Sequence, residues 1–322
     1  MSTKPKISGE EAKEDRISSL CDDLIHKIMS FMHTKYAVQT CVLSKRWKLV
    51  WKSLPYLNLM MSCEFLDEED PTEEEYEEEF SSLNNLINQV LHRRYNSNLV
   101  KVYVQDLSRY HFPDEPRFTL EGLIAYAVNH NVQQLAFQSM DLSNFAMPES
   151  FSNCKSLTAL EFDNCKWHNF TFLELPALKS LRYDSVEMTQ DFFNNPKSLL
   201  GCPNLETLEL ISLRDRGWRE DRTLFINAPN LKRLELSFFP YLRLLYLSCN
   251  VDKVVIDAPR LVSFKYKGSP PVVCSSHDFA SIHDVYFDIY KAYGRDHVQL
   301  INTLNKFRPM KSLTLSSQTV EY

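Results

Sequence analysis

Apolar positions near the N-terminus recur every three or four residues, as they do along one side of a helix. Leu24, Ile28 and Met32 lie four residues apart, with further apolar residues beside them. This spacing predicts an amphipathic helix with a wide apolar stripe. Asp22 or Asp23 is expected in its first turn, where a carboxylate suits the free backbone amides and the helix dipole.

Two more short helices are expected before Pro55. Thr34 is a candidate N-cap for the second helix and Ser44 for the third, which carries Trp47 and Trp51. Three short helices cannot bury so many large apolar side chains among themselves. The segment is therefore expected to dock on another surface.

An acidic run and a second helical pattern follow. Residues 64–79 contain eleven acidic residues and no basic one, which is typical of a solvated linker, with binding to a basic partner as the alternative. Residues 80–95 are periodic as a helix and end in His92, Arg93 and Arg94, which suit a helix C-terminus.

From residue 97 the period changes to that of strands. Short units of the pattern LxxLxL recur, and their apolar positions alternate with polar ones. The units start about 26 residues apart on average, close to the upper end of the range for leucine-rich repeats. Several follow a proline, which is tolerated just before a strand. The nine units start at Leu99, Val132, Leu157, Leu178, Leu205, Leu231, Leu261, Ile282 and Met310.

One further unit is irregular. Leu242, Leu245 and Leu247 with Asn250 also fit the repeat pattern, but they begin only eleven residues after Leu231. A full coil does not fit in that interval, so a distorted coil or a choice between two registers is expected between residues 231 and 250.

Stacked units of this kind share one core, because a single coil cannot bury its leucines. Their strands form a parallel sheet on the concave side of a solenoid, and the residues between the leucines point outward. We expect a mixed-charge face suited to a protein partner, although solvated strand residues are the plainer interpretation of any single position. The candidate substrate face consists of Glu161, Arg182, Glu209, Glu235, Lys265 and Tyr286.

Composition narrows the function classes. With 322 residues and 44% hydrophobic content the chain can bury a sizeable core, and it contains no glycine-rich phosphate loop. The net charge is −6, but without the acidic run 36 basic residues face 31 acidic ones (42 minus eleven). That balance gives no reason to expect nucleic acid as a partner.

The expected compartment is the cytoplasm, the nucleus or both. The N-terminus has no apolar segment typical of a secretory signal, and no stretch is long and apolar enough to predict a membrane span. The 8 cysteines include no CxxC pair and are too sparse for a disulfide framework. They are expected to be reduced and mostly buried.

Catalytic and metal chemistry is not indicated. The motifs GxSxG and HExxH are absent. His277, Asp278, His283 and Asp284 form the densest group of possible ligands, but a metal needs three or four converging ones and the sequence offers no second cluster. We expect no catalytic residue, no metal and no cofactor.

The N-terminal segment resembles the F-box of plant F-box/leucine-rich repeat (LRR) proteins. The resemblance is carried by Asp15-Arg16-Ile17-Ser18, Asp22-Asp23-Leu24, Thr34-Lys35, Leu43-Ser44-Lys45-Arg46-Trp47, Trp51 and Pro55. The repeats resemble the C-terminal part of the same family. The likeness therefore covers nearly the whole chain from residue 15.

The resemblance implies an α/β fold, in which a small three-helix F-box precedes an LRR solenoid with a concave parallel β-sheet. The implied divisions are a disordered leader (1–14), the F-box (15–56), an acidic linker (57–79) and the solenoid (80–322). The solenoid would begin with a helix over residues 80–95 and contain about nine irregular repeats.

The function implied by the resemblance is that of a non-catalytic substrate-recognition adaptor in a Skp–cullin–F-box ubiquitin ligase. The F-box would dock on a Skp-type adaptor, and through it on the cullin–RING ligase, while the concave face binds an unknown protein substrate. Neither nucleic acid nor a membrane is implied. The docking positions carried over are Leu20, Cys21, Leu24, Ile28, Met32, Val42, Leu43, Trp47 and Trp51, of which the tryptophans would be hot spots.

Two departures from the family pattern leave an alternative open. Cys21 stands where the family usually has proline, and losing that fixed φ is expected to weaken docking by about 1 kcal/mol. The chain ends at Tyr322, without the FBD-type segment of many members, so its last repeat is expected to lack a cap. The alternative is an LRR scaffold with a degenerate F-box. A small-ligand receptor is disfavoured, because the arc is short and has no basic floor.

Overall fold

The computed structural model describes most of the chain between residues 17 and 321. Predictions for the leader 1–14, for the acidic residues 62–72 and for the irregular unit at 242–250 lie outside the described residues. The described residues are 17, 19–61, 73–106, 118–140, 142, 148–152, 154–165, 174–186, 192–193, 195–197, 199–213, 222–238, 251, 253–269, 272–275, 279–289 and 297–321.

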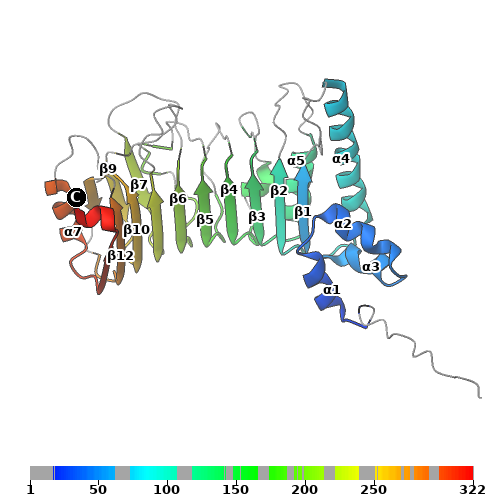
Figure 1. Ribbon diagram of the computed structural model, residues 1–322, viewed down its shortest axis with the longest axis horizontal. Coiled ribbons are helices and arrows are strands. Elements are labelled where there is room, and N and C mark those ends of the chain that lie inside the picture. The colour runs from blue at the N-terminus through cyan, green and yellow to red at the C-terminus, as the bar shows by residue number, and fades with distance from the viewer. Residues whose placement is uncertain are drawn as a thin grey trace, which may run out of the picture.

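Helices gather at the N-terminal end of a long row of strands (Figure 1). The helices are α1 (Asp22–Met29), α2 (Thr34–Gln39), α3 (Trp47–Val50), α4 (Glu73–Arg93), α5 (Phe118–Asn129), α6 (Glu149–Ser152), α7 (His297–Lys306) and α8 (Ser317–Glu321), with 3₁₀ turns η1 (Thr40–Val42) and η2 (Trp51–Ser53). The strands are β1 (Tyr56–Met61), β2 (Lys101–Asp106), β3 (Gln134–Gln138), β4 (Ala159–Asp163), β5 (Ser180–Asp184), β6 (Thr207–Ile211), β7 (Thr223–Asn227), β8 (Arg233–Ser237), β9 (Lys253–Asp257), β10 (Ser263–Gly268), β11 (Val272–Ser275), β12 (Asp284–Ile289) and β13 (Ser312–Leu315).

Ten of these strands form one parallel sheet in the order β1-β2-β3-β4-β5-β6-β8-β10-β12-β13. All nine predicted repeat units supply a strand to it, from β2 to β13, which confirms the solenoid. Equivalent positions pair across the sheet, as Leu160, Leu181 and Leu208 do in β4, β5 and β6. A second parallel sheet, β11-β9-β7, lies in three successive repeats near the C-terminus, those that begin at Leu205, Leu231 and Leu261, and was not predicted.

The predicted linker over residues 57–79 is wrong at both ends. Tyr56–Met61 forms β1, which pairs in parallel with β2, and α4 begins at Glu73 instead of residue 80. Leu57 and Leu59 are buried like the apolar pair of any other repeat. The glutamates at the start of α4 have good helix propensity and favour the positive end of its dipole, so the helix extends into the acidic run.

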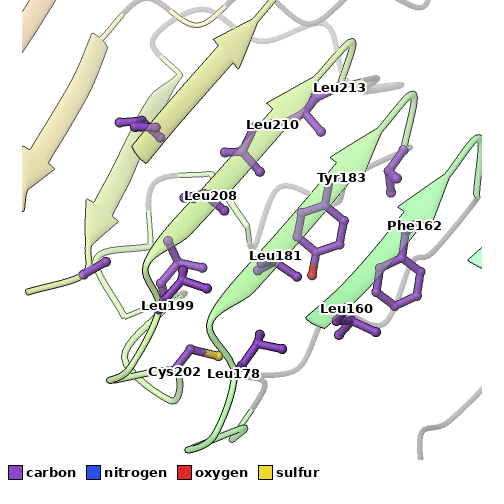
Figure 2. Packing of buried hydrophobic residues seen from close by; sticks show 14 of the residues in the cluster. Leu160, Phe162, Leu178, Leu181, Tyr183, Leu199, Cys202, Leu208, Leu210 and Leu213 are labelled. Carbon is purple, nitrogen blue, oxygen red and sulfur yellow. The ribbon is translucent and has the colours of Figure 1, made fainter. Parts of the chain in front are cut away.

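Alternate residues of most strands of the ten-stranded sheet face a continuous core, as in β4 and β5. Leu160, Phe162, Leu181 and Tyr183 are at most 1% exposed, and Figure 2 shows them pointing to the same side of β4 and β5. The rings of Phe137, Phe162 and Tyr183 stack in adjacent strands, with centroids 5.2 Å and 5.4 Å apart. Such pairs add about 0.5–1.5 kcal/mol each beyond their burial.

A left-handed residue follows each of four successive strands. Ser139, Asn164, Ser185 and Ser212 have φ between 51° and 57° directly after β3, β4, β5 and β6. Each donates its backbone N–H to the carbonyl that ends the next strand, at 2.7–2.8 Å. Serine and asparagine occupy αL more readily than branched residues do. These turns therefore hold the ends of neighbouring strands in register.

The short proline-containing segments before β6 and β8, Cys202-Pro203-Asn204 and Ala228-Pro229-Asn230, make the same side-chain hydrogen bond. Asn204 donates its side-chain amide to the carbonyl of Pro176 at 2.7 Å, and Asn230 donates in the same way to Pro203 at 2.9 Å. Each contact joins one repeat to the one before it. The asparagine of Cys-Pro-Asn and Ala-Pro-Asn therefore fixes the stacking of coils.

Helix α4 joins the N-terminal helices to the repeats. Its Val90 lies in a core with Ile25, Met29 and other residues of α1 to α3, whereas Ile87, three residues earlier, lies in the repeat core. Backbone bonds reinforce the junction, since the Tyr95 amide donates to the carbonyl of Lys52 at 2.8 Å. The two parts of the molecule are therefore packed as one body at this end (Figure 1).

Arg94 is the buried polar residue of this junction, and it is only 8% exposed. Its guanidinium donates to the carbonyl oxygen of Leu54, to the hydroxyl of Tyr126 and to that of Ser97. Burial lowers the pKa of Arg94, and the hydrogen bond to Tyr126 opposes that shift. The side chain thus links the end of the helical unit to α5 and to the loop after α4.

The other end of the sheet is partly closed by α8. Thr319 accepts a hydrogen bond from the Ile289 amide at 2.7 Å and donates to the carbonyl of Phe287 at 3.2 Å. It thereby serves the backbone of β12 beyond the shorter β13. The expectation that this end lacks any cap is wrong to that extent.

In the described part of the chain, no helix combines the length and apolar character needed to cross a bilayer.

Replacing Arg94 by methionine should destabilise the protein by about 1–3 kcal/mol, because the carbonyl of Leu54 loses its buried charged donor. Urea unfolding followed by circular dichroism measures the change. Arg93→Met is the matched control, since Arg93 is the exposed last residue of α4, next to Arg94 in the chain, and should change stability by less than about 0.5 kcal/mol. Equal effects of the two variants would contradict the role given to Arg94.

The buried thiols should resist alkylation. Burial raises the pKa of Cys165 to about 12 and that of Cys202 to about 11, so little thiolate exists near neutral pH. Iodoacetamide at pH 8 should label the exposed Cys21 and spare the other two until urea is added, as read by mass spectrometry. Labelling of Cys202 at the rate of Cys21 would be the contrary result.

Candidate protein-docking faces

Helix α1 has a buried side and an exposed side. Asp22 and Asp23 open the helix, as predicted. Ile25 and Met29 are fully buried in the core of the helical unit, whereas Leu24 and Ile28 are 51% and 41% exposed. Apolar side chains therefore face solvent directly beside the core.

The segments after α1 are held by local polar contacts. Ser44 accepts a hydrogen bond from the Trp47 amide at 3.3 Å, but α3 begins at Trp47 and its N-cap is Arg46, not Ser44 as predicted. Thr34 does not cap α2. It is the first residue of that helix, and its hydroxyl accepts the Asn58 amide of β1 at 2.8 Å. An ion pair of Arg46 with Asp22 brings the turn before α3 to the start of α1.

Val42 and Leu43 are exposed at that turn, by 83% and 62%. Val42 ends η1 and Leu43 follows it, shortly before Arg46, which is ion-paired with Asp22 of α1. Lys27 adds charge beside the patch, with its ammonium 5.0 Å from the ring centroid of Phe31. This combination of apolar surface and polar rim is typical of a protein interface.

The second candidate face is the outward side of the ten-stranded sheet, which we call the open face. All six residues of the predicted substrate face lie there in one row, paired in register across β4, β5, β6, β8, β10 and β12. The row follows from the strict alternation of the strands. Its role as a binding site stays a prediction.

Charges along this row are paired with one another. Arg182 contacts Glu161 at 3.4 Å, Asp184 at 2.7 Å and also Glu209. Burial lowers the pKa of Arg182, but the hydrogen bond and charge of Glu209 and the other carboxylates outweigh it, and the net shift is upward.

Farther along, Lys265 lies 2.7 Å from Glu235, and its ammonium is 5.9 Å from the ring of Tyr286. The open face thus carries a network of partly exposed ion pairs. Ion pairs of this kind contribute little to stability.

A metal centre finds no support among the described residues. No group of three or more histidine, cysteine or acidic side chains there could hold an ion. His283 contacts Asp284 at 3.1 Å on the surface, while residues 277 and 278 lie outside the described part.

Comparison with known proteins now adds family information. A model of the F-box domain matches residues 17–59, and a model described as "FBD-associated F-box protein At5g56370, LRR repeats" matches residues 120–278. The chain belongs to the plant F-box/LRR-repeat proteins.

Several Arabidopsis thaliana proteins are similar over most of this chain. F-box/FBD/LRR-repeat protein At4g26340 is 30% identical over 77% of this chain and 53% of its own length, and At2g26030 of the same description is 27% identical over 88% and 61%. F-box protein At4g09920 is 27% identical over 95% of this chain and 89% of its own length. The chain therefore spans little more than half of the first two relatives.

Two of the predicted docking residues are core residues of the F-box. Trp47 and Trp51 are 3% and 7% exposed and pack in the cluster that contains Val90 of α4. Both are therefore absent from the exposed surface of the F-box, and their role in docking stays a prediction. That prediction treated the F-box as a unit of three helices, whereas α4 and β1 supply the surface that buries both indoles.

The remaining positions divide by exposure. Leu20 and Met32 are partly buried against the F-box core, and Cys21 is exposed. Phe31, which follows the C-cap of α1 and is 76% exposed, was missed. The apolar residues of the F-box that are exposed, here called the F-box patch, are Ile17, Leu24, Ile28, Phe31, Tyr36, Val42, Leu43 and Leu49.

The Cys21→Pro variant should be more stable by about 0.4–1 kcal/mol. Cys21 precedes α1 with φ −69° and ψ 159°, a conformation that proline also adopts. The gain comes from fewer conformations of the unfolded chain. Thermal unfolding of Cys21→Pro beside Cys21→Ala measures it, and a Cys21→Pro variant less stable than Cys21→Ala would refute this account.

Proposed function

We propose that the protein is the substrate-recognition adaptor subunit of a Skp–cullin–F-box ubiquitin ligase. The observation that carries the proposal is the F-box patch. The F-box core is already filled by Ile25, Met29, Trp47 and Trp51 together with Val90, so the patch is surplus to folding. An apolar area of this kind on a small helical unit favours a protein partner.

The partner we propose for the patch is a Skp-type adaptor, and through it a cullin–RING ligase. The open face of the sheet would bind the protein to be ubiquitinated. The chain itself would supply position and no chemistry, which is sufficient because holding reactants together contributes much of the rate.

The compartment we propose is the cytoplasm or the nucleus. The cysteines of the described part include three buried ones, Cys154, Cys165 and Cys202, and none there is in a disulfide. Reduced thiols suit a reducing compartment.

A degenerate F-box is the alternative that Cys21 suggested. That residue has φ −69° and ψ 159°, a conformation that proline also adopts, so the substitution acts mainly on the freedom of the unfolded chain. This favours the ligase role over a scaffold without adaptor binding.

Binding of the full chain to a plant Skp-type adaptor tests the proposal by calorimetry. Val42→Asp should weaken binding by about tenfold or more, because a carboxylate would be buried at the interface, while urea unfolding stays unchanged. Val320→Asp is the control, since Val320 is 70% exposed at the opposite end. Unaltered binding by Val42→Asp, or none by the wild-type chain, would reject the proposal.

The full chain is needed in this experiment. A fragment ending near residue 60 lacks Val90 and Leu86, which pack on the F-box core. Trp47→Ala is equally unsuitable as a docking control, because truncating a buried tryptophan costs about 3–5 kcal/mol and would confuse unfolding with loss of docking.

A further inference from the structure

The open face is hollowed over β2 to β6. The hollow has a volume of about 150 Å³, room for roughly five water molecules. Small side chains line it, namely Ala136, Ala159 and Ser180, between the longer Lys101 and Arg182 of neighbouring strands. A short side chain between long ones leaves a depression, and here polar and apolar atoms line it in nearly equal parts, because Gln134, Glu161 and Glu209 also border it.

The strands beside the hollow carry surplus negative charge. The outward positions of β4, β5 and β6 include the carboxylates Glu161, Asp163, Asp184 and Glu209 and the single guanidinium of Arg182. Four negative charges against one positive leave −3 on these three strands, and Lys101 of β2, which also lines the hollow, reduces the surplus to −2. Arg182 is shared among three of the carboxylates and cannot neutralise them all.

The surplus is local. The negative charge acts on Tyr103 of β2: burial raises the pKa of its hydroxyl, and the charges of Asp163 and Glu161 raise it further. Farther along the open face, β10 presents Lys265 and Lys267, which reverses the sign. A ligand with positive charge is therefore favoured over β4 to β6 and not over the whole sheet.

We propose that the open face over β3 to β6 docks an extended basic segment of the substrate, with an aliphatic side chain in the hollow and a lysine or arginine against Asp163 and Asp184. This proposal rests on the proposed function, because it assigns a class of substrate to the same face. Asp163 and Asp184 lie two residues farther along β4 and β5 than Glu161 and Arg182, which line the hollow. Two residues of a strand span about 7 Å. The cationic and aliphatic residues of an extended segment would thus be two or three positions apart.

The first experiment selects ligands from a random library, so the substrate itself need not be identified. Phage-displayed random nonapeptides are panned on the immobilised full chain, and recovered sequences are compared with the input library. We expect enrichment of lysine or arginine two or three positions from leucine, isoleucine, valine or methionine. Recovery of sequences without this pattern, or of none above background, overturns the proposal.

Matched variants then locate the site. The best recovered peptide, labelled with fluorescein, is titrated by anisotropy against Asp163→Lys and Ser180→Leu. Each should weaken binding by about tenfold, by reversing charge or by filling the hollow, and added salt should weaken wild-type binding. The controls are Asp288→Lys and Ser263→Leu, which change the same residue types at equivalent, half-buried strand positions away from the hollow.

The controls should stay within about twofold of wild type. If a variant and its control weaken binding equally, the hollow is not the site. Adaptor binding is measured on the same preparations and should not change in any variant. Failure of the ligase proposal would appear there, and failure of the present one only in the peptide titrations.

Discussion

The repeats share one core only while their strands stay in register. Because side chains alternate along a strand, a slip of one residue in β5 would turn Leu181 and Tyr183 outward and bring Arg182 into the core. Backbone turns oppose that slip, with left-handed residues such as Ser185 bonded to the end of the next strand. The same alternation separates two tasks, since inward positions hold the fold and outward ones are free to vary with the partner.

The F-box obeys the same constraint, because it too completes its core with a neighbour's surface. Val90 of α4 packs against its tryptophans, and Tyr56 of β1 lies against the same cluster. With that core complete, the F-box patch is the surplus. Packing against α4 therefore decides which apolar side chains of the F-box are buried and which stay exposed.

Much of the solenoid could be predicted, because a period of two in short units is a strong local signal. The strands that were missed show its limits. Leu54, Leu57 and Leu59 of the β1 region also fit the LxxLxL pattern. The next unit begins only at Leu99, so the long interval made this first repeat hard to recognise. The β7, β9 and β11 strands form a second sheet in three successive repeats of different lengths, which the leucine spacing alone does not reveal.

The candidate site was predictable only in part for a related reason. Residue type identified Trp47 and Val42 alike as apolar, but their fates depend on a helix some forty residues later. On the open face, spacing alone placed Glu161, Arg182 and Glu209 in one row. The sharing of Arg182 and the hollow beside it depend on side-chain lengths in neighbouring strands, which no single repeat contains.

The junction gives these two faces a fixed relation. Separating the F-box from the first repeats would expose either Val90, which packs in the F-box core, or Ile87, which packs in the repeat core. It would also cost Arg94 its hydrogen bond to either the Leu54 carbonyl or the Tyr126 hydroxyl. The orientation of the F-box patch relative to the open face is therefore a property of the fold, and in a ligase it would decide which part of a bound substrate the conjugating machinery meets.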